Sequence, residues 1–100
     1  MNSKEIEIFI QDVRDDISNN LDGLLSYYGF LENHNIRKIV IKPSDESSFF
    51  DGAIVGALDQ RYCEFFRSKF NTDIEEIVRI EILEIIKSHL LDIRKKIKNK

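Results

Sequence analysis

The amino-acid sequence predicts an all-α fold, in which three long helices pack as an antiparallel bundle. Apolar residues recur at steps of three and four along most of the 100 residues, which is the spacing of one buried helical face. A turn rich in Asn and a lone Pro separate the first two periodic segments, and Asn71 separates the last two. We therefore expect helices at about residues 3–28, 44–70 and 72–98.

The composition is that of one folded domain. Of all residues, 42% are hydrophobic and 33% are charged, which suits a soluble protein with a single core. No Gly-rich or Ser-rich linker divides the chain, so we expect one helical domain over residues 1–100 that ends in a basic tail at residues 94–100. No apolar run has the length of a membrane span, no signal peptide opens the sequence, and the single Cys cannot form an internal disulfide. These features favour the cytoplasm.

The first periodic segment, residues 3–28, predicts an amphipathic helix with one buried face. Residues 5–10 (EIEIFI) alternate with period two and are also compatible with a strand. The helical spacing continues for many residues beyond that stretch, so it favours a helix. The residues that share the apolar face are Ile6, Phe9, Ile10, Val13, Ile17, Leu21, Leu24, Leu25 and Tyr28.

The segment at residues 36–42 (IRKIVIK) is the most strand-like part of the sequence, because it is rich in β-branched residues and stops at Pro43. A lone strand leaves its backbone hydrogen bonds unsatisfied. It therefore forms either an extended connector or one strand of a minor β-ribbon, and both interpretations stay open.

The second helix, at residues 44–70, opens with Ser44 as its cap and carries Arg61 at the centre of its apolar face. A buried arginine needs a carboxylate or another anion, because an unpaired charge there is costly. We expect Glu64, or Glu81 or Glu84 of the next helix, to supply it. Arg61 is thus either half of a structural ion pair or a residue that docks an anion or a partner.

Gly52 and Gly56 lie on the opposite side of that helix from its aromatic face. Small residues at this spacing allow another backbone to approach closely, so we expect a contact with a neighbouring helix or with a second subunit. Cys63 shares this side and adjoins Glu64, which disfavours a thiolate; we expect an inert thiol there.

The third segment, at residues 72–98, is the most apolar part of the chain. Thr72 followed by Glu75 predicts a capping box at its start. Its aliphatic residues cover a broad arc, and Ile77, Ile80 and Leu91 fall outside even that arc. A surface helix needs only one apolar stripe, so this helix is expected to be central in the fold or shared with a partner.

The sequence contains no motif of a catalytic, cofactor-binding or metal-binding site, including the GxxxxGK[ST], GxGxxG, GxSxG and HExxH patterns. His89 has no second ligand at helical spacing, so we predict neither a metal nor a cofactor. The net charge of −3, with bases gathered only near the C-terminus, is not the pattern of a dedicated nucleic-acid binder.

The leading functional hypothesis is a non-enzymatic interaction module of the inhibitor, immunity or regulatory-subunit type, which acts as a homodimer or binds a protein partner. One alternative is a nucleic-acid-binding regulator that uses Arg61, Arg67, Lys69 and the basic tail. Another is a small enzyme with an arginine–carboxylate site between helices. The residues expected at a partner interface are Ile77, Ile80, Leu91, Gly52, Gly56 and Arg61.

Overall fold

The computed structural model describes residues 2–27 and 46–98 of the chain. Four helices lie within these residues: α1 (Ser3–Tyr27), α3 (Glu46–Phe70), α4 (Glu76–Ser88) and α5 (Leu90–Lys98). The predicted all-α class is confirmed, and no strand occurs in the described ranges. The extended segment predicted at residues 36–42 lies outside them.

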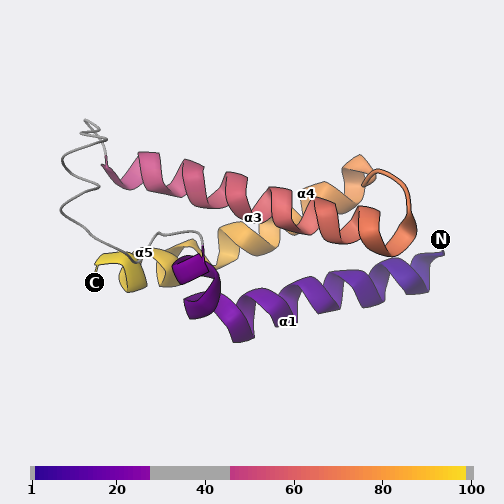
Figure 1. Ribbon diagram of the computed structural model, residues 1–100, viewed down its shortest axis with the longest axis horizontal. Helices are drawn as coiled ribbons and strands as arrows, with labels where there is room; N and C mark the ends of the chain where they lie inside the picture. The colour runs from indigo at the N-terminus through magenta and orange to yellow at the C-terminus, as the bar shows by residue number, and fades with distance from the viewer. Residues whose placement is uncertain (1, 28–45, 99–100) are drawn as a thin grey trace.

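The helices form an elongated antiparallel bundle with principal extents of 47 × 22 × 20 Å. α1 and α4 run in the same direction and α3 runs against both (Figure 1). The N-terminus lies at the end of the bundle where α3 connects to α4, and the C-terminus lies at the opposite end. Within the part of the chain that the structure describes, no helix has the combination of length and apolar character needed to cross a bilayer.

α1 begins with a side-chain cap that the sequence analysis did not identify. Asn2 Oδ1 accepts a hydrogen bond from the backbone N–H of Glu5 at 2.9 Å, which satisfies one of the free donors of the first turn. From Ser3 onward the helix is continuous, so the helical interpretation of residues 5–10 is confirmed over the strand. Of its predicted apolar face, Ile6 is partly buried, Tyr28 lies outside the described residues, and the others are buried: Phe9, Ile10, Val13, Ile17, Leu21, Leu24 and Leu25.

The connection from α3 to α4 differs from the prediction. Asn71 adopts a left-handed conformation with φ of 56°, and its N–H donates to the carbonyl of Arg67 at 2.8 Å, which ends α3. α4 then begins only at Glu76, and Glu75 precedes it as an N-cap residue without a side-chain hydrogen bond. The capping box predicted at Thr72 is therefore wrong. Two antiparallel neighbouring helices need several non-helical residues between them to reverse the chain, and residues 72–75 serve that purpose.

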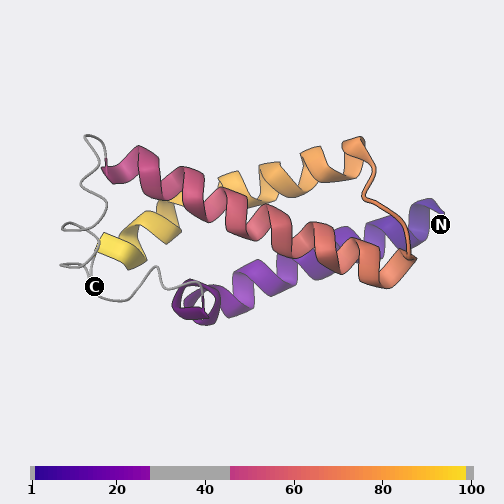
Figure 2. The same ribbon diagram turned by 45° about the horizontal axis from the view of Figure 1, so that its top comes forward.

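The long third helix predicted at residues 72–98 is also interrupted at His89, between α4 and α5. The carbonyl of Ile85, which a continuous helix would offer to the N–H of His89, accepts from Ser88 Oγ at 2.6 Å and from His89 Nδ1 at 2.9 Å. The N–H of His89 donates instead to the carbonyl of Ile86 at 3.0 Å. Side chains that capture a backbone carbonyl in this way bend a helix, and Figure 2 shows α5 leaving at an angle to α4.

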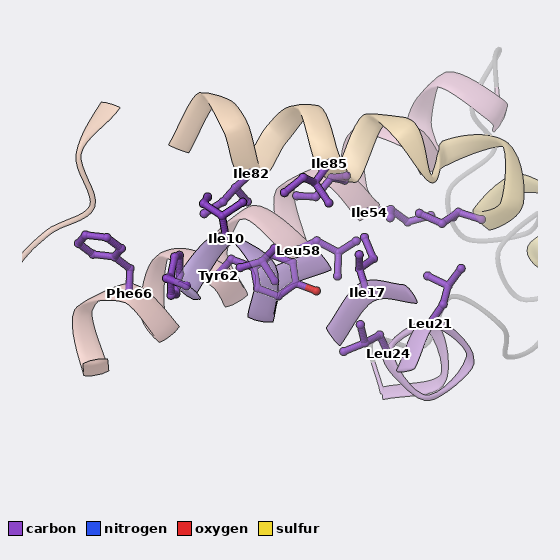
Figure 3. Packing of buried hydrophobic residues seen from close by; sticks show 14 of the residues in the cluster. Ile10, Ile17, Leu21, Leu24, Ile54, Leu58, Tyr62, Phe66, Ile82 and Ile85 are labelled. Atoms are coloured by element: carbon purple, nitrogen blue, oxygen red, sulfur yellow. The ribbon is translucent and has the colours of Figure 1, made fainter. Parts of the chain in front are cut away.

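One apolar core joins all four helices. Figure 3 shows aliphatic side chains of α1 and α4, among them Ile10 and Ile82, gathered around Leu58 and Tyr62 of α3. The rings of Phe9 and Phe66 pack edge to face with their centroids 5.3 Å apart. α4 packs against both α1 and α3, so the last segment of the chain occupies the central position expected for it. The buried residues of this core are Phe9, Ile10, Val13, Ile17, Leu21, Leu24, Leu25, Ile54, Leu58, Tyr62, Phe66, Val78, Ile82, Ile85, Ile86 and Ile93.

Candidate functional site

The outward face of α4 and α5 carries exposed aliphatic side chains. Ile77, Ile80 and Leu91 are 69%, 49% and 66% exposed, although Ile82 and Ile86 on the inward face of α4 are completely buried. The sequence placed these three residues outside the buried arc, and the single chain indeed does not cover them. They lie with two exposed charged residues in a row that we call the outer strip: Ile77, Ile80, Glu84, Lys87 and Leu91.

The charge along this face is divided between its two ends. Glu76, Glu81 and Glu84 are exposed in the first part of α4. Lys87 lies at the end of α4 and Lys95 in α5, and both are also exposed. The acidic part therefore precedes the basic part along one helical surface, with Ile80 and Leu91 on either side of the boundary.

Arg61 lies between α1 and α3 and forms an ion pair with Asp16. Its Nε lies 3.1 Å from Asp16 Oδ2, and the two side chains are 24% and 19% exposed. Its guanidinium also stacks over the ring of Phe65, 4.6 Å from the centroid. The carboxylate expected for Arg61 exists, but the prediction that Glu64, Glu81 or Glu84 supplies it is wrong. The packing of α1 beside α3, which sequence periodicity does not specify, brings Asp16 to this position instead.

Asp16 is the centre of a hydrogen-bond cluster that the sequence analysis missed. It accepts hydrogen bonds from Tyr62 Oη at 2.8 Å and from Asn20 Nδ2 at 3.0 Å, in addition to those from Arg61. Burial opposes ionisation of this carboxyl, but the hydrogen bonds from Arg61, Tyr62 and Asn20 outweigh it, so the pKa of Asp16 lies below its usual value. One feature of the sequence could have indicated this role. Asp16 follows Val13 by three residues, which places it at the edge of the buried face of α1.

Tyr62 contributes a buried ring and a hydroxyl donor to this cluster. Its side chain is fully buried, and burial together with the hydrogen bond to Asp16 raises the pKa of its hydroxyl well above the ordinary value. The hydroxyl therefore stays protonated and acts as a donor. Because the described contacts of Arg61 and Tyr62 lie within the fold, the geometry favours the structural interpretation of Arg61 over the docking one.

Gly52 and Gly56 are exposed, and a Cβ added at either would meet no described atom within 4 Å. The same side of α3 does meet α4, through an ion pair in which Arg79 Nη2 lies 2.6 Å from Asp59 Oδ2. In the described residues, therefore, no neighbouring helix approaches Gly52 or Gly56 closely. The second-subunit alternative remains a prediction.

Cys63 is partly buried and its Sγ donates to Asp59 Oδ1 at 3.7 Å. Burial, followed by the negative charge of Asp59, raises the pKa of the thiol. The sequence assigned this effect to Glu64, whereas the residue responsible is Asp59 on the preceding turn. A thiol in this environment is a poor nucleophile.

Several basic residues that the nucleic-acid hypothesis requires form ion pairs with carboxylates of the same chain. Arg67 Nη2 lies 2.6 Å from Asp73 Oδ1, and Lys69 Nζ lies 3.6 Å from Asp12 Oδ2. Lys96 of the basic tail lies 2.8 Å from Asp22 of α1. Each pair lowers the positive charge that a phosphate would meet at that position.

Two of the grooves in the described part of the chain lie along α1. The larger, of about 670 Å³, lies between the second half of α1 and α5, and contains the contact of Ser18 Oγ with His89 Nε2 at 3.3 Å. The smaller, of about 400 Å³, lies between α1 and α3 and is lined by Phe9, Asp16 and Phe65 among others. Among residues 2–27 and 46–98, no three His, Cys, Asp or Glu side chains gather in a way that would hold a metal ion.

Comparison of the chain with family models, with curated proteins and with solved structures gives no match.

Proposed function

We propose that this chain is a protein–protein interaction module that binds through the outer strip, and that its simplest partner is a second copy of itself. The observation that carries the proposal is the exposure of Ile77, Ile80 and Leu91 at 69%, 49% and 66% on one face of the last two helices. The opposite face of α4 is completely buried, so this face is an additional apolar surface and not an incompletely packed core.

The expected strength of self-association follows from the area that pairing would cover. Burying an exposed Ile or Leu side chain contributes about 1.5–3 kcal/mol, and a dimer would bury three such side chains from each copy, each already partly covered. Association costs an estimated 4–15 kcal/mol in lost freedom of motion. The two contributions are similar in size, so the dimer is expected to be weak and to form toward the upper end of the micromolar to submillimolar range.

Sedimentation velocity across the micromolar to submillimolar range tests this proposal. The average mass of the wild-type protein should rise toward that of a dimer as concentration increases. The variant Ile80→Ser should need a higher concentration to associate, because it removes apolar surface from the outer strip. Ile8→Ser is the matched control, since Ile8 is also 49% exposed but lies on the outward face of α1. A single-chain mass at every concentration, or equal effects of the two substitutions, would contradict the proposal.

The two alternative functions receive less support from the geometry. The arginine–carboxylate pair expected for an enzyme site is present between α1 and α3, as Arg61 and Asp16. However, the hydrogen bonds that Asp16 accepts stabilise its ionised form and make it a weak base for proton transfer. For the nucleic-acid alternative, Arg61, Arg67 and Lys69 each have a carboxylate partner within the fold.

A further inference from the structure

We infer that two copies of this chain pair their α4–α5 segments side by side and antiparallel, with Ile80 of each copy against Leu91 of the other and Glu84 of each against Lys87 of the other. This inference rests on the proposed self-association and adds its orientation, its register and the charges that select both. It follows from the spacing, the exposure and the order of charges in the outer strip.

The spacing of the outer strip is that of a coiled-coil seam. Its five residues follow one another at steps of three, four, three and four, and Arg94 continues the pattern three residues after Leu91. Side chains at this spacing form a row along one side of a helix, and such a row packs against a second row of the same kind. Here the row follows α4 and continues on α5 beyond the bend at His89. All six residues are exposed. The short interruption at His89 returns to helix at Leu90, so both halves of the row belong to helices.

The charges select one orientation and one register. In the proposed antiparallel pairing, each Glu84 faces Lys87 of the other copy, Ile80 faces Leu91, and Ile77 faces Arg94. No like charges face each other in these pairs. In a parallel dimer every residue would face its own copy, so Glu84 would meet Glu84 and Lys87 would meet Lys87. An antiparallel register centred on Glu84 would also place the two Glu84 carboxylates together.

The same arrangement predicts a weak and salt-sensitive dimer. Only the two Ile80–Leu91 contacts are fully apolar, and the two central Glu84–Lys87 pairs lose part of their hydration when the surfaces meet. Polar residues at the seam of a coiled coil cost stability but specify the register. Association should therefore weaken as ionic strength rises, whereas a dimer held by apolar contacts alone should strengthen or stay unchanged.

Charge reversal tests the register. Glu84→Lys and Lys87→Glu should each weaken self-association about tenfold or more, because each homodimer then holds two like-charge contacts. An equimolar mixture of the two variants should associate as well as wild type, because both central contacts of the mixed dimer join opposite charges. The double variant Glu84→Lys/Lys87→Glu should recover for the same reason. Glu64→Lys, which reverses an exposed charge on α3, is the control and should change little.

Cysteine cross-linking gives an independent readout of the pairing, in a Cys63→Ser background. Chains with Ile80→Cys should form disulfides with chains carrying Leu91→Cys. Neither variant should cross-link efficiently with itself, because residues 80 and 91 lie about 16 Å apart along a helix. Circular dichroism of each variant verifies that the helices are retained.

The outcomes separate this inference from the proposed function. If Ile80→Ser weakens the dimer but the charge reversals do not, the chain self-associates in another register and the inference is wrong. If the single reversals weaken association and the mixture fails to recover, the antiparallel register is likewise wrong. If wild type stays monomeric at every concentration, the proposed self-association itself fails. Recovery of the mixture together with cross-linking only between Ile80→Cys and Leu91→Cys chains supports the inference.

Discussion

Tyr62 of α3 donates its hydroxyl hydrogen to Asp16 of α1 at 2.8 Å, across 46 residues of sequence. The ring of Tyr62 is completely buried, so its hydroxyl needs a partner within the protein. The same carboxylate accepts from Arg61, the next residue to Tyr62, at 3.1 Å. One acidic side chain on α1 thus accepts hydrogen bonds from two consecutive residues of α3 and links the two helices.

Replacement of Asp16 should destabilise the protein substantially. Asp16→Asn removes the charge that holds Arg61 and weakens the acceptor of the buried Tyr62 hydroxyl, and we expect a loss of about 2 kcal/mol in the free energy of unfolding. Urea denaturation followed by circular dichroism measures it. The control is Asp12→Asn, since Asp12 is 64% exposed and lies 3.6 Å from Lys69. That substitution should cost less than about 0.5 kcal/mol. Equal losses would contradict a special role for Asp16.

The contribution of Asp16 should disappear in acid. Its pKa in the folded protein lies below the ordinary value of 3.8, so its ionised form is stabilised by folding. The sign of the linkage follows: this stabilisation is fully present above the unfolded pKa and is lost as the pH falls through the folded pKa. The difference in unfolding free energy between wild type and Asp16→Asn should be constant above about pH 5 and shrink at lower pH. A difference that does not depend on pH would show that the charge of Asp16 is not what stabilises the fold.

Loss of the Tyr62 hydroxyl should cost less than loss of the carboxylate. Tyr62→Phe keeps the buried ring and leaves Asp16 bonded to Arg61 and Asn20, so we expect a loss of about 1 kcal/mol. The double variant Tyr62→Phe/Asp16→Asn should lose less than the sum of the two single variants, because both remove the same hydrogen bond. Additive losses in this cycle would mean that the two side chains do not act together.

Two isoleucines on α4 should lose unfolding free energy to very different extents when they are truncated. Ile82→Ala opens a cavity at a side chain that is completely buried, and we expect a loss of about 3 kcal/mol in unfolding free energy. Ile80→Ala removes a side chain that is 49% exposed and should cost less than about 1 kcal/mol when measured at a concentration where the chain is monomeric. Similar losses at the two positions would show that Ile80 is buried within the single chain.

The helical class and the buried faces could be predicted from the sequence because they depend on local periodicity. In α1 the recurrence of Phe9, Val13 and Ile17 at helical steps places these side chains on one face whatever they later pack against. The same argument identified Ile77, Ile80 and Leu91 as residues outside the buried arc, and their exposure follows from it. The end of α3 at Asn71 was also predictable, since asparagine readily adopts the left-handed conformation found there.

The details of the last third of the chain were not predictable in this way. The start of α4 at Glu76 depends on how far the connection must run to reverse the chain beside α3. The break at His89 depends on which side chains capture the carbonyl of Ile85. At both positions the local sequence favours a helix. The three-dimensional arrangement of the neighbouring groups decides where the helix begins and where it is interrupted.

The sequence by itself therefore determined the helical class, the apolar faces that are buried and the aliphatic residues Ile77, Ile80 and Leu91 that lie outside those faces. Only the tertiary structure decided that Arg61 is paired with Asp16 instead of Glu64, Glu81 or Glu84, and that the thiol of Cys63 donates a hydrogen bond to Asp59. The physical reason is that a helical face is set by contacts within a few residues, whereas the partner of a charged group is set by which helix lies beside it.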